Sequence, residues 1–150
     1  MCIRDRFEMF ADGQVWATKE YRSNSGDDIA VQHRNLMLAG MAGMGYIDPT
    51  AAVFRVYLKE RGTPVRDAQA KPVHAGITLT RDVLASRKLL ISERCPELIK
   101  EMHLYAWDEN KPDVPIKKND HGCDALRYGV MAHFRRKYGR KVIKFTRDVA

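Results

Sequence analysis

Two side chains in the stretch NDHGCDALRY, residues 119–128, have the types and the spacing that metal chemistry needs. His121 and Asp124 are three residues apart at the start of an expected helix, which places them on one face, roughly 60° apart around the axis. Asn119 or Asp120 can serve as the cap of that helix. An imidazole and a carboxylate on one helical turn therefore form half of a candidate divalent-metal site.

The other half of the site is expected from Asp48, in the stretch GYIDPTAA. Asp48 follows a short apolar segment that reads as a buried strand, and ligands of α/β sheets bind at the carboxyl ends of strands. Two carboxylates and one histidine suit hard or borderline cations such as Mg²⁺ or Mn²⁺. A pair of such ions activates the attacking water and stabilises the leaving oxygen of a phosphodiester.

Each of these residues also has a purely structural interpretation. Asp48 stands before a proline and can simply be a helix N-cap, which from local sequence alone is the commoner role. His121 can be a polar residue of a first helical turn. Asp124 can pair with Arg127 or interact favourably with the helix N-terminus. Asp120, four residues from Asp124, is a rival ligand that we assign to capping.

Positive charge is concentrated near the C-terminus. The formal net charge is +7 and the pI about 9.5, which favours a polyanionic partner, most commonly nucleic acid. Lysine and arginine side chains on phosphates release counterions and so strengthen binding. The expected DNA-binding residues are Arg135, Arg136, Lys137, Arg140 and Lys141, and the alternative is that this stretch is only a solvated helix end.

Composition limits the class of protein. A chain of 150 residues fits one domain, and no apolar run approaches the ~18 residues of a membrane span. Three cysteines without CxxC spacing argue for a reducing compartment and against a zinc site or a disulfide scaffold. We expect three regions: a suspect non-native leader at residues 1–6 (MCIRDR) that fits no element, a domain at 7–138, and a basic tail at 139–150.

The chain reads as an opening hairpin followed by helices that alternate with strands. The apolar patterns and turn signals predict the order β-β-α-β-α-β-α-β-α-α, and hence an α/β fold with a mixed sheet that helices cover on both faces. Leu126, Val130 and Phe134 fall four apart and form the packing stripe of the last helix, away from the His121 and Asp124 face. The expected segments are strands at 7–11, 14–21, 45–47, 63–68 and 88–91, and helices at 29–42, 50–61, 75–86, from 96, and 120–138.

Four stretches of this sequence resemble the C-terminal nuclease domain of the bacteriophage terminase large subunit, the DNA-packaging motor. They are YIDPTAAVFRVYLKERG, VHAGITLTRDVLASRKLLIS, CPELIKEMHLYAWDE and NDHGCDALRYGV, and the last, an HxxDALRY-type signature, is the most specific. The resemblance implies a ribonuclease-H-like fold and a Mg²⁺- or Mn²⁺-dependent endonuclease that cuts concatemeric viral DNA. It implies that Asp48 is the second catalytic carboxylate, Asp124 the third, and His121 an accessory ligand or proton-transfer residue.

The resemblance also implies partners and two departures. The family acts on double-stranded DNA with a terminase small subunit, a portal protein and its own ATPase domain, in a packaging complex in the host cytoplasm. The family's first catalytic aspartate lies on a strand that we expect to be missing, because Asp5 is in the suspect leader and Asp12 is in a turn. No GxxxxGK[ST] loop marks an ATPase, so we expect an incomplete domain with little nuclease activity.

Two alternative functions remain open from the sequence. One is a non-catalytic DNA-binding or motor-docking module that keeps the fold without the chemistry. The other is a different ribonuclease-H-like nuclease, such as a junction resolvase, which would cleave only branched DNA.

Overall fold

The order of strands and helices follows the predicted one. The computed structural model describes residues 3–9, 14–23, 26–40, 43–69, 72–111, 114–116, 118 and 120–138, with side chains from 14 to 134. The elements are β1 (Ile3–Met9), β2 (Val15–Arg22), α1 (Ile29–Leu38), β3 (Gly45–Ile47), α2 (Ala52–Glu60), β4 (Val65–Asp67), α3 (Val73–Ala85), β5 (Leu89–Ile91), α4 (Pro96–Leu104) and α5 (His121–Tyr138).

β1, β2 and β5 form a three-stranded mixed sheet. β1 pairs antiparallel with β2, and β5 adds parallel to the other edge of β2. β1 begins at Ile3, so the expectation that the first six residues fit no element is wrong for residues 3–6, whose backbone pairs with β2. The expected Asp12-Gly13 turn lies outside the described residues.

β3 and β4 form a separate parallel pair rather than part of one continuous sheet. Within the described part of the chain, β1 pairs only with β2 and β3 only with β4, so each leaves one edge without a strand. Helix α5 packs against both β1 and β3 and so connects the two sheets. The fold class is the expected mixed α/β arrangement, but the strands are divided between two small sheets.

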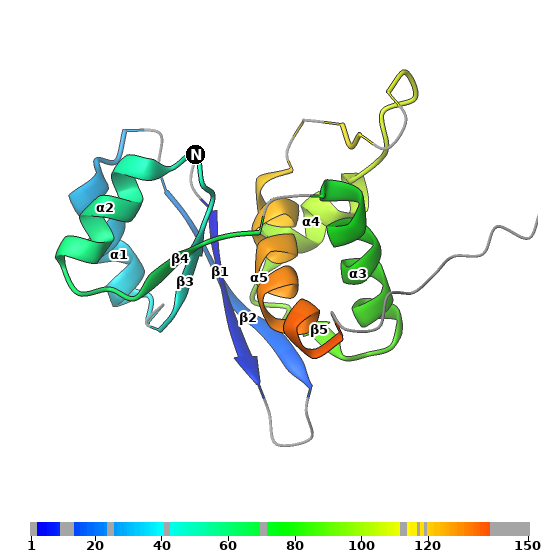
Figure 1. Ribbon diagram of the computed structural model, residues 1–150, viewed down its shortest axis with the longest axis horizontal. Helices are drawn as coiled ribbons and strands as arrows, with labels where there is room; N and C mark the ends of the chain where they lie inside the picture. Colours follow the sequence, from blue (N-terminus) through cyan, green and yellow to red (C-terminus); the bar gives the residue numbers. More distant parts are fainter. Residues whose placement is uncertain are drawn as a thin grey trace, which may run out of the picture.

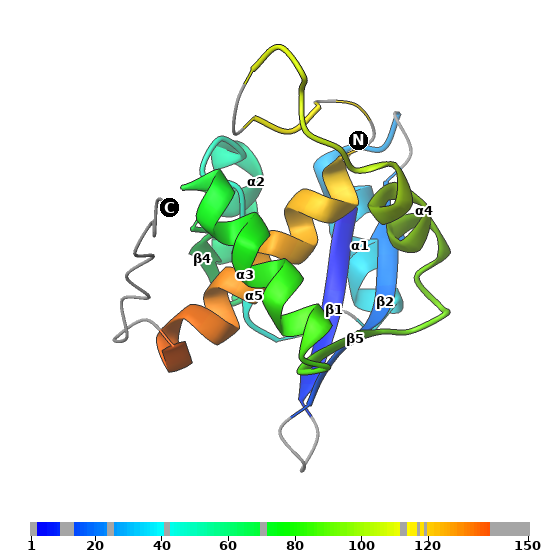
Figure 2. The same ribbon diagram turned by 90° about the vertical axis from the view of Figure 1, so that its right-hand side faces the viewer.

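Helices lie on both sides of the β1–β2 hairpin. α1 and α2 lie on one side, and α3, α4 and α5 lie on the other (Figure 1). The perpendicular view places α3 and α5 in front of the hairpin strands, with α1 behind them (Figure 2). Local sequence explains the start of α1, where the Asp28 side chain accepts a hydrogen bond from the Val31 amide at 2.8 Å, the usual contact of an N-cap.

The core has two parts, one for each sheet. The larger part holds the predicted stripe of α5, because Leu126, Val130 and Phe134 are each at most 2% exposed and pack with β2, β5, α3 and α4. The smaller part packs α1 and α2 on β3 around Leu36 and Phe54. The stripe faces the larger core, which leaves a second face of α5 for the candidate site.

Glu20 binds the N-terminus of a helix that is distant from it in the sequence. Both carboxylate oxygens of Glu20, on β2, accept hydrogen bonds from the first-turn amides of Glu97 and Leu98 at 2.9 Å. These amides have no partner within the helix, so the contact satisfies them and joins α4 to the sheet.

None of the helices within the described ranges is both long and apolar enough to cross a bilayer.

Candidate active site

Asp48 follows directly after β3, where Ile47 is buried in the smaller core. The amide and the hydroxyl of Thr50 donate hydrogen bonds to Asp48 Oδ1 at 2.8 and 2.5 Å, which is a turn closed by the aspartate side chain. α2 begins only at Ala52, with Ala51 at the N-cap. The prediction that Asp48 caps this helix is therefore wrong, because the chain first makes a turn through Pro49 and Thr50.

The predicted helix carrying His121 and Asp124 begins where expected. α5 starts at His121, directly after the buried Asp120. Its first turn is held by Glu101 of α4, whose Oε2 accepts a hydrogen bond from the Gly122 amide at 2.6 Å. An added Cβ at Gly122 would lie 2.7 Å from that oxygen, so a larger residue there would force the Glu101 carboxylate to shift. Glu101 Oε1 also binds Arg22 of β2 at 2.7 Å, which fixes this end of α5 relative to the sheet.

Arg127 pairs with Asp124 on the same helix, one of the interpretations open from the sequence. Its Nη2 donates a hydrogen bond to Asp124 Oδ1 at 2.7 Å, and its side chain is only 4% exposed. The stem of Arg127 lies against Gly76 of α3, where a Cβ would be 2.8 Å from its Cγ and Cδ. Gly76 therefore allows α3 and α5 to pack closely enough to bury the guanidinium beside Asp124.

Gly76→Ala is expected to lower the free energy of unfolding by about 1–3 kcal/mol, the usual cost of overpacking. The added methyl group displaces the Arg127 stem, and with it the group that pairs with Asp124. Urea titration followed by circular dichroism measures the change. The matched control is Gly26→Ala, because a Cβ there meets nothing within 4 Å; equal losses in both variants would contradict this role for Gly76.

Tyr128 connects the two candidate carboxylates. Its hydroxyl donates a hydrogen bond to Asp48 Oδ2 across 80 residues of sequence. Burial raises the pKa of Tyr128 far above its ordinary value, and the Asp48 hydrogen bond and the charge of Asp124 raise it further. The hydroxyl therefore stays protonated and remains a donor.

The pKa of Asp48 lies below its ordinary value, so its carboxylate stays ionised at lower pH than usual. Burial alone would raise its pKa, but hydrogen bonds from Thr50 and Tyr128, together with the charge of Arg127, lower the pKa below its ordinary value. Asp124 pairs with Arg127, and Asp124 also acts on Tyr128. Asp48 and Asp124 thus both interact with Arg127 and Tyr128. The fold therefore places the two carboxylates around the same two side chains.

His121 and the predicted DNA-binding residues are not brought together with the two carboxylates by any contact described here. His121 is exposed on the first turn of α5, and the described residues contain no group of three histidine, cysteine, aspartate or glutamate side chains placed to hold a metal. Two carboxylates fit part of the ligand set of a hard cation, and a further ligand would have to join them. Arg135, Arg136 and Lys137 lie on α5 with undescribed side chains, and Arg140 and Lys141 lie outside the described residues.

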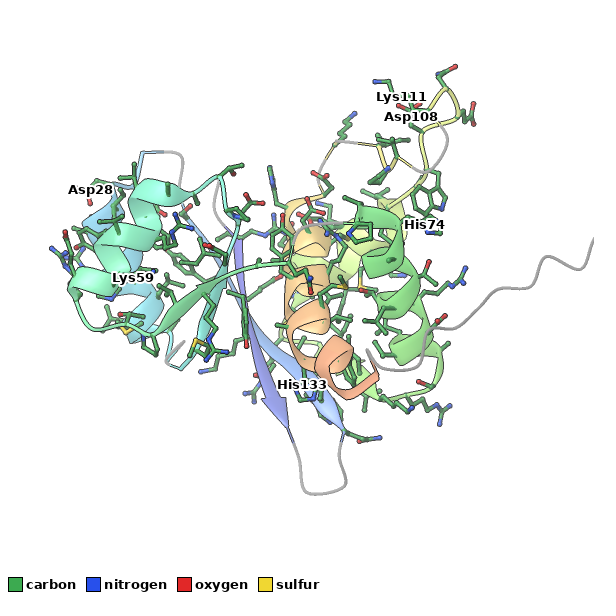
Figure 3. The ribbon with its side chains drawn as sticks, viewed as in Figure 1. Asp28, Lys59, His74, Asp108, Lys111 and His133 are labelled. Atoms are coloured by element: carbon green, nitrogen blue, oxygen red, sulfur yellow. The ribbon has the colours of Figure 1, made fainter. Side chains whose placement is uncertain are left out.

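Sequence reasoning missed the supporting residues Glu101 and Tyr128. The one available signal for Tyr128 was its place four residues after Asp124, which puts both side chains on one helical face. Glu101 had none, because its partners are 79 and 21 residues away. Figure 3 shows His74 at the start of α3 and Asp108 and Lys111 at the tip of the loop that leads towards α5.

A cleft of about 400 Å³ opens beside the site. It lies between the β3–β4 sheet and α5, and its α5 wall, Met131 and Ala132, is one helical turn beyond Tyr128. Tyr46 and Arg66 line the sheet wall. The cleft therefore carries one basic and one acidic side chain, Arg66 and Asp67, and its helix wall continues along α5 from Tyr128.

Comparison with known proteins finds similarity to bacteriophage large terminases. No protein-family model matches the chain. The large terminase subunit of Escherichia phage T5 is 27% identical over 99 residues, a match that covers 61% of this chain and 23% of that protein. The chain therefore spans about a quarter of that curated relative.

Solved structures extend the match to most of the chain. The large terminase of a thermophilic bacteriophage superposes with a TM-score of 0.80 at 25% identity, over 87% of this chain and 35% of that chain. The nuclease domain of the bacteriophage SPP1 large terminase, a structure with bound Mn, superposes with a TM-score of 0.65 at 17% identity, over 91% of this chain and 87% of that domain. The chain is thus a relative of the bacteriophage terminase large subunit, and its fold is that of the terminase nuclease domain.

Proposed function

We propose that this chain is the nuclease part of a phage DNA-packaging enzyme and hydrolyses phosphodiesters of concatemeric double-stranded DNA with Mg²⁺ or Mn²⁺. The observation that carries the proposal is the meeting of Asp48, at the end of β3, with the Asp124 helix through Tyr128 and Arg127. The SPP1 nuclease domain was solved with bound Mn, which supports the use of a divalent cation.

In this proposal Asp48 and Asp124 hold the cation, and His121 is an accessory ligand or a proton carrier at the helix start. The metal would supply an activated water and would stabilise charge on the phosphate and leaving oxygen. Thr50 and Tyr128 hold the two oxygens of Asp48, and Arg127 holds one oxygen of Asp124. Thr50 donates two hydrogen bonds to Asp48 Oδ1, so the lone pair of Asp48 that a metal would use is on Oδ2, beside the hydrogen bond from Tyr128.

The proposed metal site requires a further carboxylate in addition to Asp48 and Asp124. The resemblance assigns the first catalytic aspartate to the first strand of the family's sheet, and we propose that this is a strand other than β1, although β1 carries Asp5. We accordingly propose that the 150-residue chain by itself cuts DNA weakly or not at all. The basic residues 135–141 would bind the phosphate backbone, and the small subunit, the portal protein and the ATPase domain would be partners in the host cytoplasm.

The test is plasmid nicking by a full-length large subunit that contains this chain, with Mn²⁺ and with EDTA. Cleavage that needs Mn²⁺ and disappears in the Asp48→Asn/Asp124→Asn double variant is the expected result. Metal-dependent cleavage that survives loss of both carboxylates would refute the proposal.

The absence of a three-ligand cluster among the described residues, and the Asp124–Arg127 ion pair, favour a second candidate. This is a non-catalytic DNA-binding or docking module in which Arg127 permanently neutralises Asp124. It predicts salt-sensitive DNA binding that does not change with Mn²⁺ or EDTA, whereas the nuclease proposal predicts metal-dependent cleavage.

A further inference from the structure

Tyr128 is the side chain that joins the strand bearing one candidate ligand to the helix bearing the other. It stands four residues after Asp124, so both side chains are on the same face of α5. Its hydroxyl donates a hydrogen bond to Oδ2 of Asp48, the residue that directly follows β3 of the β3–β4 sheet. No residue of the first helical turn makes this connection in the hydrogen bonds described.

The hydrogen bonds to the other oxygen of Asp48, Oδ1, come from nearby in the sequence. Both donors to Oδ1 belong to Thr50, two residues along the chain, so they form wherever this turn forms. They orient the carboxylate relative to its own turn but do not set its position relative to α5. The Tyr128 hydrogen bond is long-range, and it therefore sets the separation between Asp48 and the Asp124 helix.

Burial supports a fixed role for the hydroxyl. Tyr128 is partly buried and the Arg127 guanidinium lies 4.8 Å from the centre of its ring. Arg127 in turn holds Asp124 and is packed on Gly76 of α3. The tyrosine ring is thus held on one side by the group that pairs with Asp124, while its hydroxyl holds Asp48.

We propose that Tyr128 is a positioning residue that sets the spacing of Asp48 and Asp124 for a shared divalent cation. This inference rests on the proposed function, because it assigns a role within the same metal site. Side chains that orient metal ligands through hydrogen bonds typically change metal affinity by about 10–100-fold when they are removed. The hydroxyl of Tyr128 is expected to have an effect of this size without touching the metal.

The experiment is a Mn²⁺ titration of the 150-residue chain, with free Mn²⁺ followed by electron paramagnetic resonance. Tyr128→Phe is expected to raise the Kd for Mn²⁺ by about 10–100-fold, with a melting temperature close to that of the unmodified chain. The matched control is Tyr21→Phe, which removes a hydroxyl that accepts one hydrogen bond from Asn35 at 3.3 Å, away from the site. An unchanged Kd in Tyr128→Phe, or an equal rise in Tyr21→Phe, would overturn the inference.

A double-mutant cycle separates this inference from the proposed function. If Tyr128 acts through Asp48, Tyr128→Phe has little further effect on Mn²⁺ binding in an Asp48→Asn background. A full additional effect in that background would overturn the positioning role. If Asp48→Asn alone leaves Mn²⁺ binding unchanged, the metal site itself is wrong, and the proposed function fails together with the inference.

Discussion

Asp124→Asn is expected to reduce Mn²⁺-dependent DNA cleavage by the full-length large subunit by at least about 100-fold. The loss corresponds to about 2.7 kcal/mol of transition-state stabilisation, within the several kcal/mol that a bound metal supplies. The substitution keeps the size of the side chain and its ability to accept from Arg127, but removes the negative charge that a hard cation needs. Initial rates of plasmid nicking at saturating Mn²⁺ measure the effect.

Asp82→Asn is the matched control for this prediction. Asp82 is exposed on α3 beside Arg81, so its substitution removes the same charge without touching the site. Its cleavage rate should stay within about twofold of the unmodified enzyme, since isolated surface charges contribute little. Comparable losses in both variants would show that net charge, rather than metal binding at Asp124, accounts for the effect.

Glu101→Ala is expected to lower the free energy of unfolding by about 3 kcal/mol, a cost that follows from its burial and its two partners. Glu101 is 4% exposed and binds both Arg22 and the Gly122 amide. Removing one partner of a buried ion pair typically costs about 3–5 kcal/mol because it leaves the other charge uncompensated. The low end applies here, since the Arg22 side chain keeps 22% of its surface exposed and can be partly rehydrated.

Equilibrium unfolding in urea measures this change, and Glu93→Ala provides the comparison. Glu93 is exposed in the loop before α4, and we expect its removal to change stability by no more than about 0.5 kcal/mol. A loss below about 1 kcal/mol in Glu101→Ala would contradict the view that Glu101 anchors α5. The same variant should also weaken Mn²⁺ binding, because His121 and Asp124 lie on the turn that Glu101 holds.

The helix that carries the site could be predicted from the sequence because its evidence is local. The four-residue spacing of Leu126, Val130 and Phe134 fixes which face of α5 is buried, and all three are in the core. The Asp28 cap of α1 is equally local, since its hydrogen bond spans only three residues. Asp48 was placed correctly at the end of a strand.

The local role of Asp48 and the sheet arrangement could not be predicted in the same way. Aspartate before proline is a common helix start, but here the Thr50 amide and hydroxyl close a turn first. The division into two sheets depends on which strand edges meet in space, and neither alternation nor turn residues specify that. The contacts of Tyr128 and Glu101 are equally non-local, and their energies arise only in the folded chain.

The central claim is that Asp48 and Asp124 share one cation, and anomalous diffraction from crystals of this chain soaked in Mn²⁺ tests it most directly. The account predicts a single Mn²⁺ peak with an oxygen of each carboxylate at about 2–2.5 Å, the range of oxygen ligands to hard cations. A Mn²⁺ peak on only one of the two carboxylates, or crystals in which the two point into separate regions with no shared ion, would contradict it.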